Sequence, residues 1–498
     1  MSLPSFEIHA HMCMLICACI LVCSAREEFP ESDPEDTSEE LTEVVCLESD
    51  LQDGQMMEVE VGQHSVLLSR TEGEYSAIGN QCTHYGAPLS QGVISGNTVR
   101  CPWHGACFNI HTGDLEEYPG MDCLPCHKVQ TTPTDIYSHF NVILKCWTGR
   151  NSELSVSAGA ASLICAETLR QENFGGRIIM VTRDDLLPYD KTRLSKVLPS
   201  KLCNTNSNIL VMNGSVFIVF CMEVASYLVD KASSVTVIGS SELPYQNTLG
   251  REIGKVSMMM LTEQNVKFYM NENVTEIKGV DGKVKEVVLK SGKVIPADVL
   301  IVGIGIKPNS EFLRGSKILT DSKNFVPVDR YMRTNVPGVF CGGDLATFPL
   351  AMAKNRPVNI GHWQMAQAHG RIAALNMLDK QIELSSVPFY WTVLLGKTIR
   401  YTGFGEGYTD IVMKGALEDR KFLALYIKND EVVAAASLNY DPAASAVAER
   451  FAAGKVITKK EAEVVYFISW LRVSWGYSSD SPETPQFRCC SVSLIGGV

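Results

Sequence analysis

Two short motifs in the first quarter of the chain pair a cysteine with a histidine. Residues 82–84 read Cys-Thr-His, residues 101–104 read Cys-Pro-Trp-His, and 16 residues separate His84 from Cys101. Two thiolates and two imidazoles could hold one tetrahedral zinc ion. They could also hold a [2Fe–2S] cluster in which one iron takes both thiolates and the other takes both imidazoles. The one-to-one match of cysteine and histidine in both loops favours the cluster, because zinc ribbons usually offer Cys-x-x-Cys pairs.

The residues around these pairs resemble Rieske ferredoxins over positions 46–137. The similarity includes CTHYGAPL at residues 82–89 and CPWHGACFNIHTGDLEEYPG at residues 101–120, which supply small residues for tight loops around a cluster. The resemblance implies an all-β domain over residues 46–140 with a Rieske-type [2Fe–2S] cluster. The ligands that it implies are Cys82, His84, Cys101 and His104.

Three substitutions within the Rieske-like loops predict a low reduction potential. High-potential Rieske proteins carry an extra cysteine in each loop, and the matching positions here are Ala87 and Trp103. Ala106 has no hydroxyl that could donate a hydrogen bond to a bridging sulfide. Fewer donors disfavour the more negative reduced cluster, so we expect a ferredoxin-like centre, with Cys107 as a packed thiol.

Residues 123–127 read CLPCH, which is the spacing of c-type haem attachment. The motif lies within the last strands of the Rieske-like region, where a haem would have no room. We therefore interpret it as two incidental cysteines followed by a surface histidine, His127.

From about residue 155 the sequence takes on an α/β pattern. A helix-like run over residues 160–173 is followed by two glycines and by the apolar run at residues 177–183, as in a βαβ unit. The turn before the helix keeps Gly159, the central glycine of a dinucleotide-binding loop, where the backbone can approach a pyrophosphate.

Three further segments resemble the apoptosis-inducing factor and ferredoxin reductase group of flavin-dependent NAD(P)H reductases. They are residues 187–196 (LPYDKTRLSK), 297–309 (ADVLIVGIGIKPN) and 334–344 (TNVPGVFCGGD). Together with the Rieske-like part, residues 46–463 resemble the apoptosis-inducing factor 3-like proteins. The resemblance implies an α/β flavoprotein fold with two dinucleotide-binding domains and a small α/β C-terminal domain, and it implies FAD and NAD(P)H as cofactors.

This resemblance also assigns roles to single residues. Lys196, held by Glu223 beside the flavin N5 edge, would form a catalytic pair that orients the nicotinamide. The alternative is two solvated surface charges, and for His362 and Trp363 the alternative to a flavin cap is a packed core pair. Trp391 would form an aromatic wall near the flavin, or would pack in the core or at an interface. The cofactor-binding residues implied are Gly159, Arg193, Lys196, Gly343, Asp344, His362 and Trp363.

The nicotinamide half departs from the family pattern. Val-Phe-Cys at residues 219–221 stands where we expect a glycine loop, and bulky side chains there would keep the backbone from a pyrophosphate. Only 27 residues separate Lys196 from Glu223, fewer than the roughly 30 of one βαβ unit. We therefore predict a missing segment between about residues 200 and 214. A displaced Glu242, with no arginine nearby, weakly favours NADH over NADPH.

These patterns predict a multidomain chain. In order, we expect an N-terminal segment and acidic linker (1–45), the Rieske domain (46–140), an incomplete first part of the FAD domain (155–213), the NAD(P)H domain (214–300), the second part of the FAD domain (301–385), the reductase C-terminal domain (388–465) and a tail (466–498).

Composition limits the partners and the compartment. With 44 basic and 56 acidic residues, the net charge of −12 opposes a nucleic-acid or anionic-membrane surface. The apolar segment at residues 12–25 is shorter than the roughly 20 residues that a bilayer requires, so a membrane span is not expected. The 17 scattered cysteines favour a reducing compartment, with the cytoplasm as the prediction and the mitochondrion as the alternative.

Three functions are compatible with these features. The first is an NAD(P)H oxidoreductase that passes electrons through FAD to the Rieske cluster and then to an unidentified acceptor. The second is a pro-apoptotic scaffold, and the third is a Rieske electron carrier with a vestigial, non-catalytic reductase module. The resemblance also allows a homodimer through the C-terminal domain.

Overall fold

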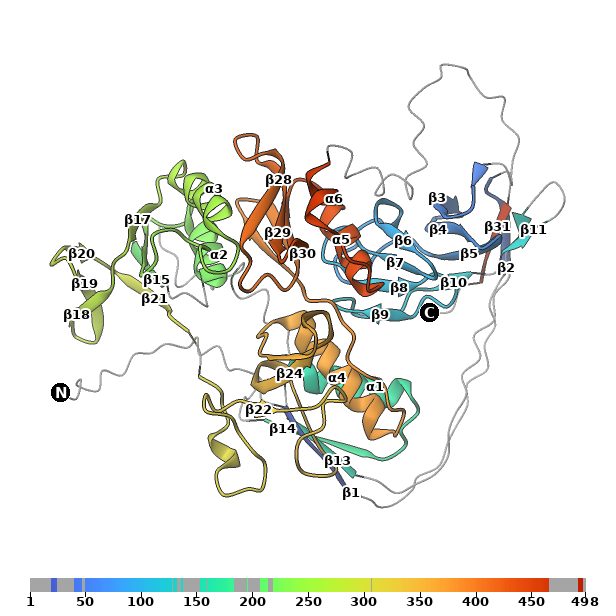
Figure 1. Cartoon of the computed structure of the whole chain (residues 1–498), viewed down its shortest axis with the longest axis horizontal. Helices are drawn as coiled ribbons and strands as arrows, with labels where there is room; N and C mark the ends of the chain where they lie inside the picture. The colour runs from blue at the N-terminus through green and yellow to red at the C-terminus, as the bar shows by residue number, and fades with distance from the viewer. Residues whose placement is uncertain are drawn as a thin grey trace.

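The computed structural model describes residues 19–24, 40–46, 50–127, 129–131, 136–137, 153–157, 159–182, 195, 207–213, 218–305, 307–464 and 491–495. These residues form a β-rich Rieske part, two α/β parts and a C-terminal domain. The C-terminal domain lies between the Rieske part and the nicotinamide part (Figure 1). In the described part of the chain, no helix combines the length and the apolar character that crossing a membrane requires.

The Rieske part consists of two antiparallel four-stranded sheets. In the first, β4 alternates between two cores: Leu67 packs with the cluster loops, whereas Val66 and Leu68 pack on the opposite face. The hairpin from β4 to β5 turns at Glu72 and Gly73, both at positive φ, as two-residue hairpin turns require. The first sheet contains β10 (Cys126–His127), β5 (Glu74–Gly79), β4 (His64–Thr71) and β3 (Gln55–Val61). The second contains β6 (Val93–Ser95), β7 (Thr98–Arg100), β8 (Cys107–Asn109) and β9 (Leu115–Glu117).

The nicotinamide part is built on a parallel sheet in the order β17-β16-β15-β21. Its strands and helices are β15 (Asn208–Asn213), α2 (Ile218–Leu228), β16 (Ser234–Gly239), α3 (Arg251–Thr262), β17 (Lys267–Met270) and β21 (Val299–Gly303). Because β15 pairs with β16 and β21, this part includes residues from Asn208 onward, earlier than the sequence boundary at residue 214. An antiparallel sheet follows, formed by β18 (Val274–Val280), β19 (Lys283–Leu289) and β20 (Val294–Pro296).

The flavin part contains a sheet to which the N-terminal apolar segment contributes a strand. Strand β1 (Cys19–Ser24) lies between β13 (Glu153–Ser157) and β23 (Val339–Gly342) and runs antiparallel to both. Helix α1 (Ala160–Gln171) leads from β13 to the parallel strand β14 (Arg177–Val181). A small sheet with β22 (Val326–Pro327), β24 (Ala346–Leu350) and β25 (Arg356–Val358) and helix α4 (Trp363–Met377) complete this part.

Helices α1 and α4 pack closely because Gly370 has no side chain. A Cβ atom at this position would lie 2.0 Å from the carbonyl oxygen of Ala161. The contact fixes the beginning of α1 against α4, close to the predicted flavin motifs.

The C-terminal domain is a five-stranded antiparallel sheet in the order β26-β27-β30-β29-β28 with two helices. One face shares a core with the nicotinamide part, through residues such as Tyr401 and Phe422, and the other packs on α5 through Leu423 and Val447. The elements are β26 (Phe389–Leu394), β27 (Lys397–Gly403), β28 (Asp410–Ala416), β29 (Lys421–Lys428), β30 (Glu431–Leu438), α5 (Ala443–Ala452) and α6 (Lys459–Glu463). Two strand pairs lie outside these parts: β2 (Glu40–Val44) with β31 (Ser491–Ile495), and β11 (Gln130–Thr131) with β12 (Ile136–Tyr137).

Candidate functional site

Two tight loops bring the Cys-x-His and Cys-x-x-His pairs together. In the first loop, the amide of Cys82 donates to the carbonyl of Ala87 at 2.9 Å, and in the second the amide of Cys101 donates to the carbonyl of Ala106 at 2.7 Å. Gly86 and Gly105 adopt positive φ angles of 72° and 77° in these turns. The glycine after each Cys–His pair therefore allows the positive φ angle that the tight loop requires.

The four predicted ligands form two facing pairs. The Nδ1 atoms of His84 and His104 lie 3.1 Å apart, and the two rings meet edge to face with centroids 4.7 Å apart. Cys82 and Cys101 are buried, and a hydrogen bond between their side chains raises the pKa of Cys82, which burial raises further. One pair of sulfurs and one pair of nitrogens is the donor set of a Rieske cluster.

The same geometry distinguishes a two-iron cluster from a single zinc ion. Among the residues that the structure describes, no group of three or more His, Cys, Asp or Glu side chains is placed to hold one metal ion. The two-and-two arrangement fits two irons, each with two protein ligands, better than one tetrahedral ion with four.

Trp391 lies next to the histidine pair, on strand β26 of the C-terminal domain. Its ring centroid is 4.4 Å from that of His104 and 5.4 Å from that of His84. The same ring meets His362 edge to face, with centroids 5.6 Å apart. The Trp391 side chain is 8% exposed. One buried ring therefore contacts two of the four predicted cluster ligands and one predicted flavin residue.

The first flavin residues meet where α1 begins. Gly159 is the N-cap of α1 and provides no side-chain cap, which leaves backbone N–H groups of the first turn free to bind an anion. Trp363 packs on Ala160 and Ala161 in this turn. A glycine N-cap without a side-chain cap fits the turn that would bind the pyrophosphate of FAD.

The second flavin motif lies beside the start of α4. Gly343 has a φ of 74°, and its amide donates to Nδ1 of His369 at 3.1 Å. Gly361 faces the carboxylate of Asp344, and a Cβ atom there would lie 3.5 Å from its Cγ. His362 is the N-cap of α4 and accepts a hydrogen bond from the Gln364 amide. A carboxylate beside a glycine fits a ligand hydroxyl of FAD.

Glu223 is tied to the C-terminal domain. One carboxylate oxygen accepts a hydrogen bond from the Val393 amide at 3.0 Å, and the other accepts one from the hydroxyl of Ser195. Arg193 and Lys196 lie outside the described residues, so the pairing of Lys196 with Glu223 remains a prediction.

The interpretation of the nicotinamide loop was partly wrong. Val219, Phe220 and Cys221 belong to the first turn of α2 and pack into a core rather than into a glycine loop. The connection itself, residues 214–217, lies outside the described residues. Glu242 does have an arginine beside it, since Arg251 at the start of α3 forms a bidentate ion pair with it.

Two predictions about the Rieske part have opposite outcomes. Cys107 is a packed thiol as expected, and burial raises its pKa to about 12. His127 is buried instead of lying at the surface, because β10 pairs with β5 and turns this side chain inward. Burial lowers the pKa of His127 to about 4.

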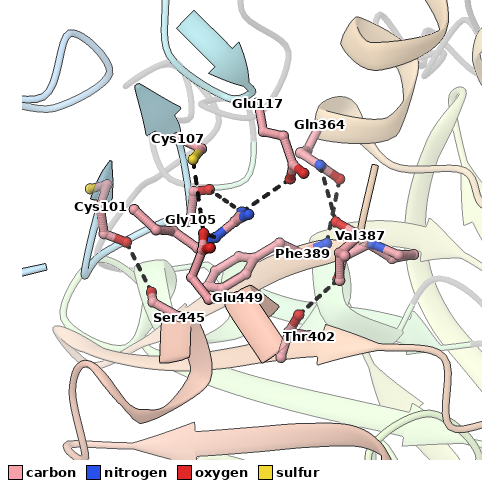
Figure 2. Close-up of polar contacts among 12 residues, drawn as sticks. Cys101, Gly105, Cys107, Glu117, Gln364, Val387, Phe389, Thr402, Ser445 and Glu449 are labelled. Atoms are coloured by element: carbon pink, nitrogen blue, oxygen red, sulfur yellow. Dashed lines mark hydrogen bonds and ion pairs between the residues drawn. The ribbon is translucent and has the colours of Figure 1, made fainter. Parts of the chain in front are cut away.

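The contacts that join the Rieske part to the C-terminal domain could not be predicted from the sequence. Arg100 is 1% exposed, and its guanidinium binds Glu449 of α5 at 2.5 Å and Glu117 of β9 at 3.0 Å. Figure 2 shows both carboxylates beside Cys107 and Gly105. The residues that pair here are up to 349 positions apart in the chain, so no local motif could reveal them.

Further contacts of this interface surround the second cluster loop. Ser445 donates from its hydroxyl to the carbonyl of Cys101 at 2.9 Å (Figure 2). Phe389 packs on Gly105, where a Cβ atom would lie 2.6 Å from the ring. The loop that carries two ligands is therefore held by the C-terminal domain.

The fold and the paired ligands define a reductase with a Rieske domain in the same chain. Family models agree: a Rieske [2Fe-2S] domain matches residues 42–128, a pyridine nucleotide-disulphide oxidoreductase matches residues 219–370, and a reductase C-terminal domain matches residues 389–464. The chain is 42% identical to apoptosis-inducing factor 3 of Homo sapiens over 89% of both chains, and 42% identical to the Mus musculus protein over 90% of this chain and 91% of the relative. The chain belongs to the apoptosis-inducing factor 3 family.

More distant relatives share the reductase part. The ferredoxin–NAD(+) reductase component of a biphenyl dioxygenase system from Paraburkholderia xenovorans (strain LB400) is 29% identical over 43% of this chain and 52% of its own. Among solved structures, the covalent putidaredoxin reductase–putidaredoxin complex has a TM-score of 0.59 at 17% identity, covering 64% of this chain and 96% of that one. This likeness shows the fold of a ferredoxin reductase.

The chain is thus an NAD(P)H-linked flavin oxidoreductase with a Rieske centre, and its cofactors are a [2Fe–2S] cluster, FAD and NAD(P)H. The alignment with the human relative also bears on the predicted missing segment. It extends over 544 positions but includes only 89% of the 498 residues of this chain. The relative therefore contains residues that this chain lacks inside the aligned region, whereas a missing segment between about residues 200 and 214 remains a prediction.

Proposed function

We propose that this chain passes electrons from NAD(P)H, through its flavin, to its own Rieske centre. The observation that carries the proposal is the position of Trp391, whose ring contacts both His84 and His104 and also lies 5.6 Å from His362. Bound FAD would supply the conversion between a two-electron hydride and single electrons.

The chain's own residues would hold the two redox sites in one arrangement. Gly159 and Asp344 would bind FAD, and the Trp391 ring contacts the predicted cluster ligands His84 and His104. The contacts of Arg100 with Glu449 and Glu117 join the two parts through buried charges. Fixed positions make the transfer intramolecular, so it needs no encounter between separate proteins.

Glu223 would support the nicotinamide side of the site. Its carboxylate is buried and joins α2 to β26, the strand that also carries Trp391. The hydroxyl of Ser195, the residue before Lys196 in the sequence, donates to the same carboxylate. This arrangement supports the proposed Lys196–Glu223 pair, which would orient the nicotinamide.

The final acceptor would lie outside the chain and would receive its electrons one at a time, because the centre returns electrons singly. The name of the relatives connects the family with apoptosis, and we propose a role in cell death as a second function. A role in cell death would not require electron transfer through Trp391. The NADH titration described next therefore distinguishes the two functions.

Anaerobic titration of the full-length holoprotein with NADH tests the proposal. In the wild type we expect the flavin absorption to bleach, followed by the appearance of the reduced-cluster EPR signal. Trp391→Leu should keep flavin bleaching and slow cluster reduction at least tenfold, while Trp391→Phe should retain most of the rate. Tyr426→Phe, a buried aromatic of the same sheet, is the matched control.

Three outcomes would contradict the proposal. Equal cluster reduction in wild type and Trp391→Leu would exclude the ring from the route. Full-length protein that purifies with a reducible cluster but no bound flavin would favour a simple Rieske carrier. Bound flavin that NADH does not bleach would favour the scaffold.

A further inference from the structure

Arg400 is a buried cation of the C-terminal domain with no part in the route described above. It lies on β27 and is 7% exposed. Its Nε donates to the carbonyl of Trp103 at 2.6 Å, and Trp103 lies between the predicted ligands Cys101 and His104. The guanidinium therefore reaches from the reductase into the second cluster loop.

The strand register places Arg400 next to Trp391. These two residues are directly opposite in the antiparallel pair β26–β27, and directly opposite residues project from the same face of a sheet. One cross-strand pair thus contacts the cluster loops twice. The Trp391 ring meets the two imidazoles, and the Arg400 guanidinium holds the backbone between two ligands.

The Arg400 guanidinium is less exposed to water than the carboxylate with which it pairs. Its second contact is an ion pair with Asp441 at 2.8 Å, in which the arginine side chain is 8% exposed and the aspartate side chain 35%. Water screens the carboxylate more than the guanidinium, so the pair does not cancel at the loop. A guanidinium stays protonated in proteins, so the positive charge is permanent.

A permanent cation beside the cluster has a definite effect on electron uptake. Reduction adds one negative charge to the centre, and a nearby positive charge stabilises the reduced form. The removal of a unit charge at about 12 Å, in a medium of effective dielectric constant about 20, changes such an equilibrium about tenfold. For a one-electron couple, tenfold corresponds to about 59 mV.

We propose that Arg400 is a positioning residue that holds the second cluster loop and raises the reduction potential of the docked Rieske centre. The biological role of Arg400 rests on the proposed function, since a higher cluster potential favours electron flow from the flavin to the cluster. The effect of Arg400 on the potential can be measured whether or not that function is correct. Arg400 offsets part of the low potential that Ala87, Trp103 and Ala106 predict from the sequence.

The test is a redox titration of the full-length holoprotein with dithionite and mediators, followed by EPR of the cluster. Arg400→Gln keeps hydrogen-bond donors but removes the charge, and should lower the midpoint potential by about 59 mV, a tenfold change in the equilibrium. Arg400→Lys keeps the charge and should stay near the wild-type potential, with shifted g-values because the bond to Trp103 changes. Asp441→Asn removes the counter-ion and should raise the potential.

Arg420→Gln is the matched control, because Arg420 lies on the same domain but pairs with Glu263 of the nicotinamide part. It should leave the potential unchanged. A wild-type potential in Arg400→Gln with a full iron and sulfide count would overturn the proposal, as would an equal fall in Arg400→Gln and Arg400→Lys. If Arg400→Gln loses the cluster, Asp441→Asn decides, and an unchanged or lowered potential there refutes the inference.

The titration uses a chemical reductant, so it gives an answer even if NADH fails to reduce the cluster. If NADH does not reduce the cluster but Arg400→Gln lowers the midpoint potential, only the proposed function is contradicted. If NADH reduces the cluster but Arg400→Gln leaves the midpoint potential unchanged, only this inference is contradicted.

Discussion

Replacement of Glu449 by alanine should open the contact between the Rieske part and the C-terminal domain. Glu449 binds Arg100, whose side chain is 2% exposed, so its loss leaves a buried cation with one fewer partner. The loss of one partner from a buried ion pair costs about 3–5 kcal/mol. Arg100 keeps Glu117 at 3.0 Å and the Gly105 carbonyl at 2.9 Å, and we therefore expect the lower end, about 3 kcal/mol.

An effect of this size lowers the docking equilibrium constant about 100-fold, because about 1.4 kcal/mol is tenfold. Hydrogen–deuterium exchange measures it directly. Amides of α5 and of residues 101–107 should lose protection by up to the same factor, whereas β16 in the nicotinamide part should exchange as in the wild type. The rate of NADH-driven cluster reduction should fall with the docked population.

Two variants control this experiment. Glu449→Gln preserves the shape and an acceptor for Arg100 and should have a smaller effect than alanine. Glu406→Ala removes an exposed ion pair with Arg356 and should leave exchange unchanged. Wild-type protection of α5 in Glu449→Ala would refute the reasoning, because it would mean that the buried charges do not hold the interface.

The remaining predictions concern the cluster and the flavin motif. Cys82→Ser should abolish the visible absorption and EPR signal of the cluster, whereas Cys107→Ser should leave both unchanged; loss of the signal in both would contradict the ligand assignment. His369 is fully buried, and burial lowers its pKa to about 3, so the unfolded chain takes up a proton between about pH 6.5 and 3 that the folded state does not. Stability should therefore fall as pH decreases through this window, by up to about 1.4 kcal/mol per pH unit, and His369→Gln should flatten the slope of urea midpoints between pH 6.5 and 4.5. An unchanged slope would show that His369 is protonated in the folded state.

The cluster site could be predicted from the sequence because its elements are local. Each loop carries one cysteine, one histidine and a glycine within five residues. The geometry at Cys82 and Cys101 then follows from two short turns closed by backbone hydrogen bonds.

The errors came from features that depend on packing between distant segments. Val219 and Phe220 were interpreted as an obstructed loop because bulky apolar residues suit either a blocked loop or the first turn of a buried helix, and only the position of β15 decides. His127 was predicted at the surface because a histidine after a turn has no local signal of burial, and its pairing with Ala77 turns it inward. Arg251 reaches Glu242 only through the turn that begins α3.

The interface around Cys101 also has a consequence for how the protein matures. The hydroxyl of Ser445 that caps the Cys101 carbonyl is encoded 344 residues later, and Trp391 follows the histidines by nearly as much. At about 5–20 residues per second, the ribosome needs roughly 20 to 70 s to add that length of chain. During this interval the Rieske loops emerge without their cover, and after synthesis the C-terminal sheet closes over them. Iron and sulfide delivery would have its best access to the nascent polypeptide, before the last domain emerges.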